Sequence, residues 1–297
     1  MKALVNGTLF TASGEAIPGG TLLMEAGKIA QVGRGIPVPK DAEVLDVSGM
    51  YVLPGLVDAH THIGLEEEGV GETYSDLNEE TDPITPHLRA MDAITPGDRG
   101  IRDALEGGIT TAFVAPGSAN VIGGLGVVIK TAGSLVDEMV VRDAATGEPL
   151  MGLKIALGEN PKHTYGPKKT PATRMGIAGL LRETLVRGQN YIDKRNRDGE
   201  RHEEDLKMDV IARLLGRDIP ARIHVHRADD ILTALRIAEE FGLRAVLDHA
   251  TEGHKLAEEL AARNIPVVVG PTLIARVKVE LREIDFRTPG ILARAGV

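Results

Sequence analysis

The pattern of apolar and polar residues changes once along the chain, near residue 54. Before that point, short runs of alternating character punctuated by glycines predict strands at Lys2–Leu9, Thr21–Glu25, Lys28–Val32 and Glu43–Asp46. After it, short apolar runs alternate with longer amphipathic segments, which is typical of βα units built around a parallel sheet. We therefore expect a small N-terminal β-sandwich module over residues 1–53 and an α/β domain over residues 54–297.

Seven apolar runs in the second part predict strands, and five amphipathic segments predict helices. The strands are expected at Gly55–His62, Ile109–Ala115, Gly126–Thr131, Leu153–Leu157, Ala221–His226, Arg244–His249 and Pro266–Val269. The helices are expected at Pro96–Gly107, Thr173–Arg195, Glu203–Leu215, Asp229–Phe241 and His254–Arg263. Because eight parallel strands close a TIM-type barrel, we expect a (β/α)8 barrel that is incomplete at strand 8. The C-terminal strands of the β module would then also lie outside the sequence.

Histidines gather at the ends of three predicted strands. His60 and His62 close the first strand, His224 and His226 the fifth, and His249 the sixth, so these ends hold five of the nine histidines. Residues two apart on a strand project to the same face, and active sites of parallel barrels lie at the carboxyl ends of the strands. Imidazole nitrogens are common ligands of divalent cations. The pattern predicts a metal site at this end of the barrel.

The fourth predicted strand offers two candidates for an anionic ligand. Lys154 is unusual within an apolar strand, where it is either a salt-bridged lysine or one whose amine becomes a carbamate bridging two metals. Glu159 lies beyond the strand end and would need neither modification nor burial. We favour Glu159, and Lys154 stays an alternative.

Composition restricts the function further. With 42% hydrophobic residues the chain can bury a large core, and the absence of cysteine limits metal ligands to nitrogen and oxygen. A net charge of −9 opposes binding to nucleic acids or anionic membranes. The first residues lack the apolar run of a signal peptide, and no segment approaches the roughly 20 apolar residues of a membrane span. We expect a cytoplasmic protein that binds a small molecule, with no nucleic-acid or membrane partner, and homo-oligomer formation is compatible with these features.

The segment Gly55-Leu-Val-Asp-Ala-His-Thr-His62, with histidines after strands five and six, resembles the metal-dependent amidohydrolase superfamily, in the group related to imidazolonepropionase. The resemblance covers nearly the whole chain and implies one or two divalent metals, zinc first, with manganese, iron or nickel as alternatives. His226 is preferred to His224 because His226-Arg-Ala-Asp229 resembles the family's exit from strand five into a helix. The metal ligands implied are His60, His62, Glu159 or Lys154, His226 and His249.

The resemblance also implies the reaction. Such enzymes hydrolyse carbon–nitrogen bonds of amides or cyclic amides, other than peptide bonds, by attack of a metal-bound hydroxide on the substrate carbonyl. Their catalytic aspartate ends strand eight, which we expect beyond Val297, so the chain is expected to be a C-terminally truncated piece and its catalytic residue is unknown. The alternatives are a deaminase on the same scaffold and a catalytically silent metal-binding or assembly relative.

Substrate contacts are expected from the loops at the strand ends. His163 and Tyr165 follow the fourth strand among basic residues, Lys168 and Lys169 included, most of whose charges we expect to be solvated. The long acidic loop after the first strand is expected to cover the pocket. The candidate substrate-binding residues are His87, His163, Tyr165 and His224.

Overall fold

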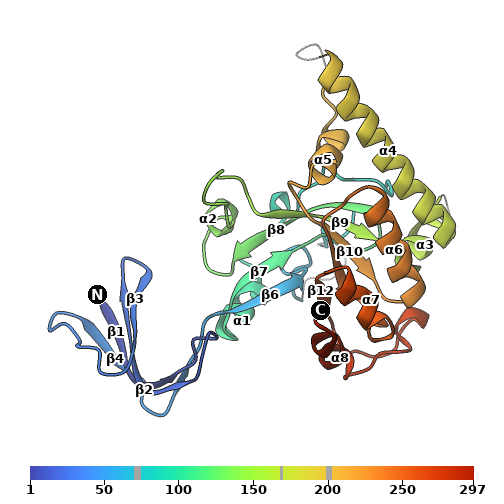
Figure 1. Cartoon of the computed structure of the whole chain (residues 1–297). Coiled ribbons are helices and arrows are strands. Elements are labelled where there is room, and N and C mark those ends of the chain that lie inside the picture. The colour runs from blue at the N-terminus through green and yellow to red at the C-terminus, as the bar shows by residue number, and fades with distance from the viewer. Residues whose placement is uncertain (70–74, 168–169, 199–202) are drawn as a thin grey trace. The chain divides into compact units, whose positions relative to one another are not determined.

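The computed structural model describes residues 1–69, 75–167, 170–198 and 203–297, and Figure 1 shows its helices and strands. The predicted positions Lys168 and Lys169 and part of the acidic loop lie outside the described residues. The chain divides into two compact units, Met1–Leu56 and Val57–Val297, each with its own sheet.

The first unit is a five-stranded mixed sheet. β1 pairs with β2 antiparallel and with β4 and β5 parallel, and β3 lies at the outer side of β2. Ala3, Leu9 and Leu23 are buried in it. The strands are β1 (Lys2–Leu9), β2 (Ile17–Glu25), β3 (Lys28–Gly33), β4 (Glu43–Asp46) and β5 (Tyr51–Val52).

The second unit is built on a nearly closed, barrel-like sheet of seven strands, which confirms the predicted fold class. The order in the sheet follows the order along the chain, with β6 and β12 at its two edges. The strands are β6 (Leu56–Thr61), β7 (Ile109–Val114), β8 (Ile122–Lys130), β9 (Met151–Ala156), β10 (Ala221–Val225), β11 (Ala245–His249) and β12 (Val267–Val269).

Helices follow most of these strands, and Figure 1 shows α4, α6 and α7 grouped around the side of the sheet that holds β9 and β10. The helices are α1 (Arg99–Glu106), α2 (Val136–Met139), α3 (Glu159–Tyr165), α4 (Arg174–Asp198), α5 (Leu206–Leu215), α6 (Ala228–Glu240), α7 (Ala257–Ala262) and α8 (Thr288–Ala295). The described residues also form short 3₁₀ helices, among them η2 (Ala90–Asp92), η4 (Gly253–Leu256) and η5 (Val279–Leu281). In the described residues, no helix is both long and apolar enough to cross a bilayer.

The sheet departs from the predicted all-parallel arrangement at β8. This strand runs antiparallel to both β7 and β9, whereas β9, β10, β11 and β12 run parallel to one another. The expectation was wrong because the strand begins at Ile122 rather than Gly126, so that only residues 115–121 link it to β7. A parallel crossover needs a dozen or more residues, whereas a short link returns the chain antiparallel.

The core surrounds the middle strands. All five residues of β10 are buried, and their apolar side chains belong to one large cluster with those of α4, α5 and α6. The edge strand β6 is much less covered, since Leu56 is 55% and Val57 67% exposed. The histidines therefore lie at the ends of strands that differ in burial, with β10 buried and β6 largely exposed.

Candidate metal centre

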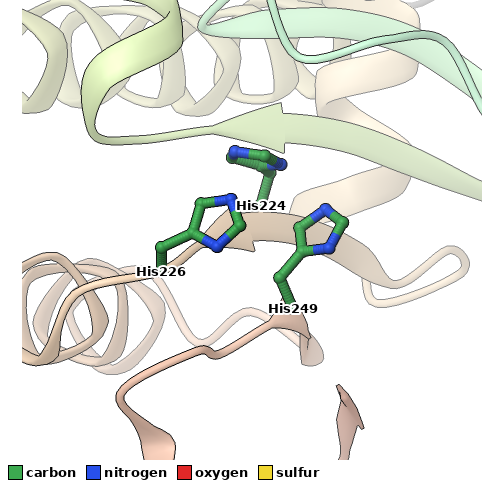
Figure 2. A group of neighbouring side chains, drawn as sticks. All are labelled: His224, His226 and His249. Atoms are coloured by element: carbon green, nitrogen blue, oxygen red, sulfur yellow. The ribbon is translucent and has the colours of Figure 1, made fainter. Parts of the chain in front are cut away.

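Three histidines converge at the adjacent ends of β10 and β11. His224 lies on β10, His226 directly follows it, and His249 is the last residue of β11. The two strands are paired in parallel with Val225 opposite His249, which brings the three side chains to one rim. One ring nitrogen from each lies within 4.8 Å of the others, and Figure 2 shows the three rings around a common space.

The histidine pair on β6 joins this group. The ring centroids of His60 and His249 are 4.7 Å apart, and those of His60 and His62 are 5.2 Å apart. The residues predicted at three strand ends are thus brought together into one cluster of five imidazoles.

Hydrogen bonds at Nδ1 fix how most of these rings are oriented. His62 Nδ1 donates to the carbonyl oxygen of Ala115 at 2.7 Å, and His249 Nδ1 donates to that of Gly270 at 2.6 Å. A carbonyl can only accept, so the proton of each neutral ring is on Nδ1 and Nε2 keeps its lone pair. Histidine ligands of metals show this arrangement, with one nitrogen held by an oxygen and the other free to coordinate.

His60 and His226 also have an oxygen near Nδ1, but the carbonyl argument does not extend to them, because the Asp248 contact lacks hydrogen-bond geometry and the Thr251 hydroxyl can donate or accept. His60 Nδ1 lies 3.1 Å from Asp248 Oδ2, and His226 Nδ1 lies 2.7 Å from Thr251 Oγ1. In His224, Nδ1 is buried without a hydrogen-bond partner, and Nε2 is 3.5 Å from the Asn160 amide. Four of the five rings thus have an oxygen within 3.1 Å of Nδ1.

Burial keeps the cluster uncharged, as metal ligation requires. Desolvation, reinforced by the positive charge of Lys154, lowers the pKa of His62 to about 4 and that of His249 to about 3. Desolvation, followed by electrostatic interactions with His249 and Lys278, lowers the pKa of His226 to about 2. These side chains are neutral bases near pH 7, so the site fits a divalent cation held by nitrogen ligands.

The two candidates for the anionic ligand lie in different places. Lys154, on β9, is 1% exposed, and its Nζ is 3.5 Å from His60 Nε2. Desolvation lowers the pKa of Lys154 to about 8. Glu159 begins α3 instead of lying in a loop, and its Oε2 accepts the backbone N–H of Glu280 at 3.4 Å. Of the two, Lys154 is the one whose terminal atom contacts the histidines.

A buried ion pair between Asp248 and Arg222, which the sequence analysis did not predict, lies against the histidine cluster. Asp248 is fully buried beside His249, and its Oδ1 accepts from Arg222 Nη2 at 2.6 Å. The same nitrogen donates to the carbonyl of Ala59 at 2.7 Å, next to His60 in the chain. Gly152 makes room for this arginine, since a Cβ there would lie 2.9 Å from Arg222 Cγ. A charged residue within the apolar run Ala245–His249 was the signal that could have revealed this pair.

A second carboxylate, Glu280, was also missed by the sequence analysis. It is 1% exposed, and its Oε1 is 3.7 Å from His226 Nε2 and 3.9 Å from His224 Nε2. Its position after β12, in a segment without strand or helix periodicity, gave no sequence signal.

The predicted substrate-binding residues are dispersed. His224 lies in the cluster, and His87 lines a cavity of about 290 Å³, with no described residue hydrogen-bonded to its buried Nδ1. Pro116 and Gly123 line the same cavity, and a Cβ on Gly123 would lie 3.6 Å from Lys154 Cγ, so the cavity adjoins the cluster. His163 is exposed on α3.

Tyr165 is buried rather than open to a ligand. Its hydroxyl donates to Asn120 Oδ1 at 2.6 Å, and the Asn120 amide donates to Thr85 Oγ1 and to the carbonyl of Glu79, each at 2.8 Å. This network ties α3 to the loop that carries His87.

Comparisons with known proteins agree with this architecture. No protein-family model matches the chain. A crystal structure of an amidohydrolase from Thermotoga maritima is 48% identical, with a TM-score of 0.94, over 100% of this chain and 77% of that one. Amidohydrolase tasK from Hapsidospora irregularis is 32% identical over 264 residues, which are 81% of this chain. A dihydroorotase from Geotalea daltonii is 50% identical over 48 residues, 15% of this chain.

These matches differ in how much of each relative they include. The chain spans about a quarter of the length of tasK, 27%, and 11% of the dihydroorotase, but more than three quarters of the Thermotoga protein. That last match joins high sequence identity to a common fold over the whole chain. The chain belongs to the amidohydrolase superfamily.

Proposed function

We propose that the protein is a metal-dependent hydrolase of carbon–nitrogen bonds in amides or cyclic amides, other than peptide bonds. The observation that carries this proposal is the grouping of His60, His62, His226 and His249, each with an oxygen within 3.1 Å of Nδ1. The free Nε2 atoms leave a set of uncharged ligands at the rim where barrel enzymes perform their chemistry.

We assign the anionic ligand to a carbamate on Lys154 rather than to Glu159, because the Lys154 amine reaches His60 whereas the Glu159 carboxylate is directed to Glu280. Carbamate formation joins the neutral amine to carbon dioxide with loss of one proton and leaves a carboxylate on nitrogen. A bound divalent metal would supply an acidified water and polarise the scissile carbonyl. Zinc is the first expectation for this metal.

The protein's own groups would position the substrate. The cavity of about 290 Å³ is lined by His87 and by polar side chains that include Asp76 and Asn78, and these are the groups that we expect to contact a substrate there. Relatives named dihydroorotase and D-hydantoinase match short stretches of the chain, and both names refer to rings with carbon–nitrogen bonds. We therefore favour cyclic amides as substrates, and within the superfamily we place the chain near the imidazolonepropionase-related group.

The test compares metal binding with hydrolysis. We expect the protein, produced with zinc, manganese or iron, to retain metal after dialysis, and His226→Ala to weaken metal binding at least 100-fold, because a buried ligand is lost. The matched control, His163→Ala, removes an exposed histidine of α3 and should leave metal content unchanged. Elemental analysis measures the metal, and a screen of amides and lactams measures activity.

The same screen separates the proposal from its rivals. Ring opening without ammonia supports cyclic amide hydrolysis, and ammonia release supports deamination. A wild-type protein that retains no metal under any of these conditions would refute the proposal.

A further inference from the structure

A carboxylate from outside the strand ends reaches the histidine cluster. Glu280 lies in η5, after β12, and one of its oxygens, Oε2, accepts the backbone N–H of Glu159 at 2.9 Å. The other, Oε1, faces the Nε2 atoms of His226 and His224 at 3.7 and 3.9 Å. One oxygen therefore holds the side chain in place while the other is presented to the cluster.

Both separations are too long for a shared hydrogen bond. His226 Nδ1 is paired with the Thr251 hydroxyl, which can accept from it or donate to it. In the tautomer with the proton on Nδ1, Nε2 turns its lone pair toward Glu280 Oε1. Such an approach is unfavourable in a buried site unless a cation lies between the atoms. Two ligands bound to one zinc at about 2.0–2.2 Å lie roughly 3–4 Å apart, which is the spacing seen here.

Lys278 supplies the cation that now neutralises Glu280. Its Nζ is 2.7 Å from Glu280 Oε1 and also donates to Asn160 Oδ1 at 2.9 Å. Because Lys278 also contacts Asn160, it would keep a hydrogen-bond partner after moving away from the carboxylate. The single positive charge of Lys278 compensates the negative charge of Glu280. A divalent cation bound there would do the same with twice the charge.

We propose that Glu280 is a carboxylate ligand of the metal held by His226 and His249, and that Lys278 competes with the metal for its Oε1. This inference rests on the proposed function, since it needs the histidine cluster to bind a metal. It adds an oxygen ligand from the segment after β12 to ligands that otherwise come from strand ends.

The test is a titration of the chelator-treated chain with Co²⁺, followed by competition with Zn²⁺. Glu280→Gln keeps an oxygen that accepts from Glu159 and removes the charge. We expect it to weaken metal binding more than about 100-fold, beyond the range usual for residues that only orient a ligand. The visible bands of bound Co²⁺ should also change, because they report the number and kind of ligands.

Lys278→Met should act in the opposite direction and strengthen metal binding by several-fold, because it removes the competing cation. A merely structural role of this pair would make both substitutions weaken binding. Glu283→Gln changes a neighbouring carboxylate that is 44% exposed and serves as the control, with no change expected.

The outcomes separate this inference from the proposed function. If His226→Ala abolishes metal binding while Glu280→Gln leaves affinity within about threefold and the Co²⁺ bands unchanged, Glu280 is no ligand and the hydrolase proposal stands. If the wild-type chain binds neither metal, both proposals are wrong. Circular dichroism of each metal-free variant shows whether the fold is kept, and Glu280→Asp should recover part of the affinity if the carboxylate itself binds.

Discussion

The two halves of the histidine cluster rest on strands with very different surroundings. His226 follows β10 and His249 ends β11, two strands inside the sheet, and every residue of β10 is buried. His60 lies on the edge strand β6 and His62 directly follows it, and Leu56 and Val57 of this strand are more than half exposed. The half with His226 and His249 is held by packing, whereas the half with His60 and His62 lacks most of that packing.

Polar contacts supply what packing does not provide at the edge. Arg222 donates to the carbonyl of Ala59, Asp248 lies against His60, and His62 donates to the carbonyl of Ala115. These bonds join β6 to residues of β10 and β11 and to the end of β7. The comparison teaches that a rigid site can be built on a poorly buried strand if charged groups from buried strands hold it.

The largest effect is expected from breaking this polar link. Asp248→Ala leaves the buried Arg222 guanidinium without its carboxylate, which typically costs about 3–5 kcal/mol of unfolding free energy. Urea unfolding measures the loss. The control is Asp103→Ala, which breaks an exposed pair with Arg99 and should cost less than about 1 kcal/mol. Equal losses in the two variants would mean that the buried pair does not support the edge.

A second pair of substitutions tests the packing side of the comparison. Ile223→Ala empties a fully packed position in β10 and should cost about 2–5 kcal/mol. Val57→Ala on β6 should change stability by no more than about 0.5 kcal/mol, because the side chain is mostly exposed. A comparable loss for both would show that β6 is covered in solution and would remove the contrast.

The smallest effect concerns how the rings are oriented. His226 is held by the Thr251 side chain, whereas His62 and His249 are held by backbone carbonyls that no side-chain change removes. Thr251→Val should weaken metal binding by about 10–100-fold, as is usual for a partner that orients a ligand, with little change in stability. Thr251→Ser should keep the wild-type affinity. Metal titration of the three proteins checks this, and unchanged affinity in Thr251→Val would show that packing alone orients His226.

The sequence predicted the strands of the second unit well, because buried strands are short apolar runs between turn residues. The strands β7, β10 and β11 lie within one residue of their expected bounds. The direction of β8 was lost through an error of four residues at its start, since strand direction depends on the length of the link before it. The helix α3 was missed because Gly158 and Pro161 indicate a loop.

The site was predictable as far as it depends on strand ends. The histidines were found because they follow recognisable apolar runs, and the parallel strands bring those ends together. Asp248 was missed although a charge within an apolar strand was a signal, because the sequence does not show that Arg222 is its partner, and Glu280 carried no such signal. The choice between Lys154 and Glu159 likewise depended on which side chain reaches His60, a distance that only the folded chain defines.

The reversed strand β8 has a consequence for how this protein can change its substrate. In a fully parallel barrel each strand delivers its own loop to the active-site rim, and new activities arise by altering those loops. Here the link 115–121 is the single connection at that rim for β7 and β8, and it is confined, since a Cβ on Gly117 would collide with Asn78. The longer connection 131–150 lies at the opposite end of the strand. Insertions in 131–150 would therefore not alter substrate choice. In the part of the barrel formed by β7 and β8, loop changes are not expected to produce new substrate specificities.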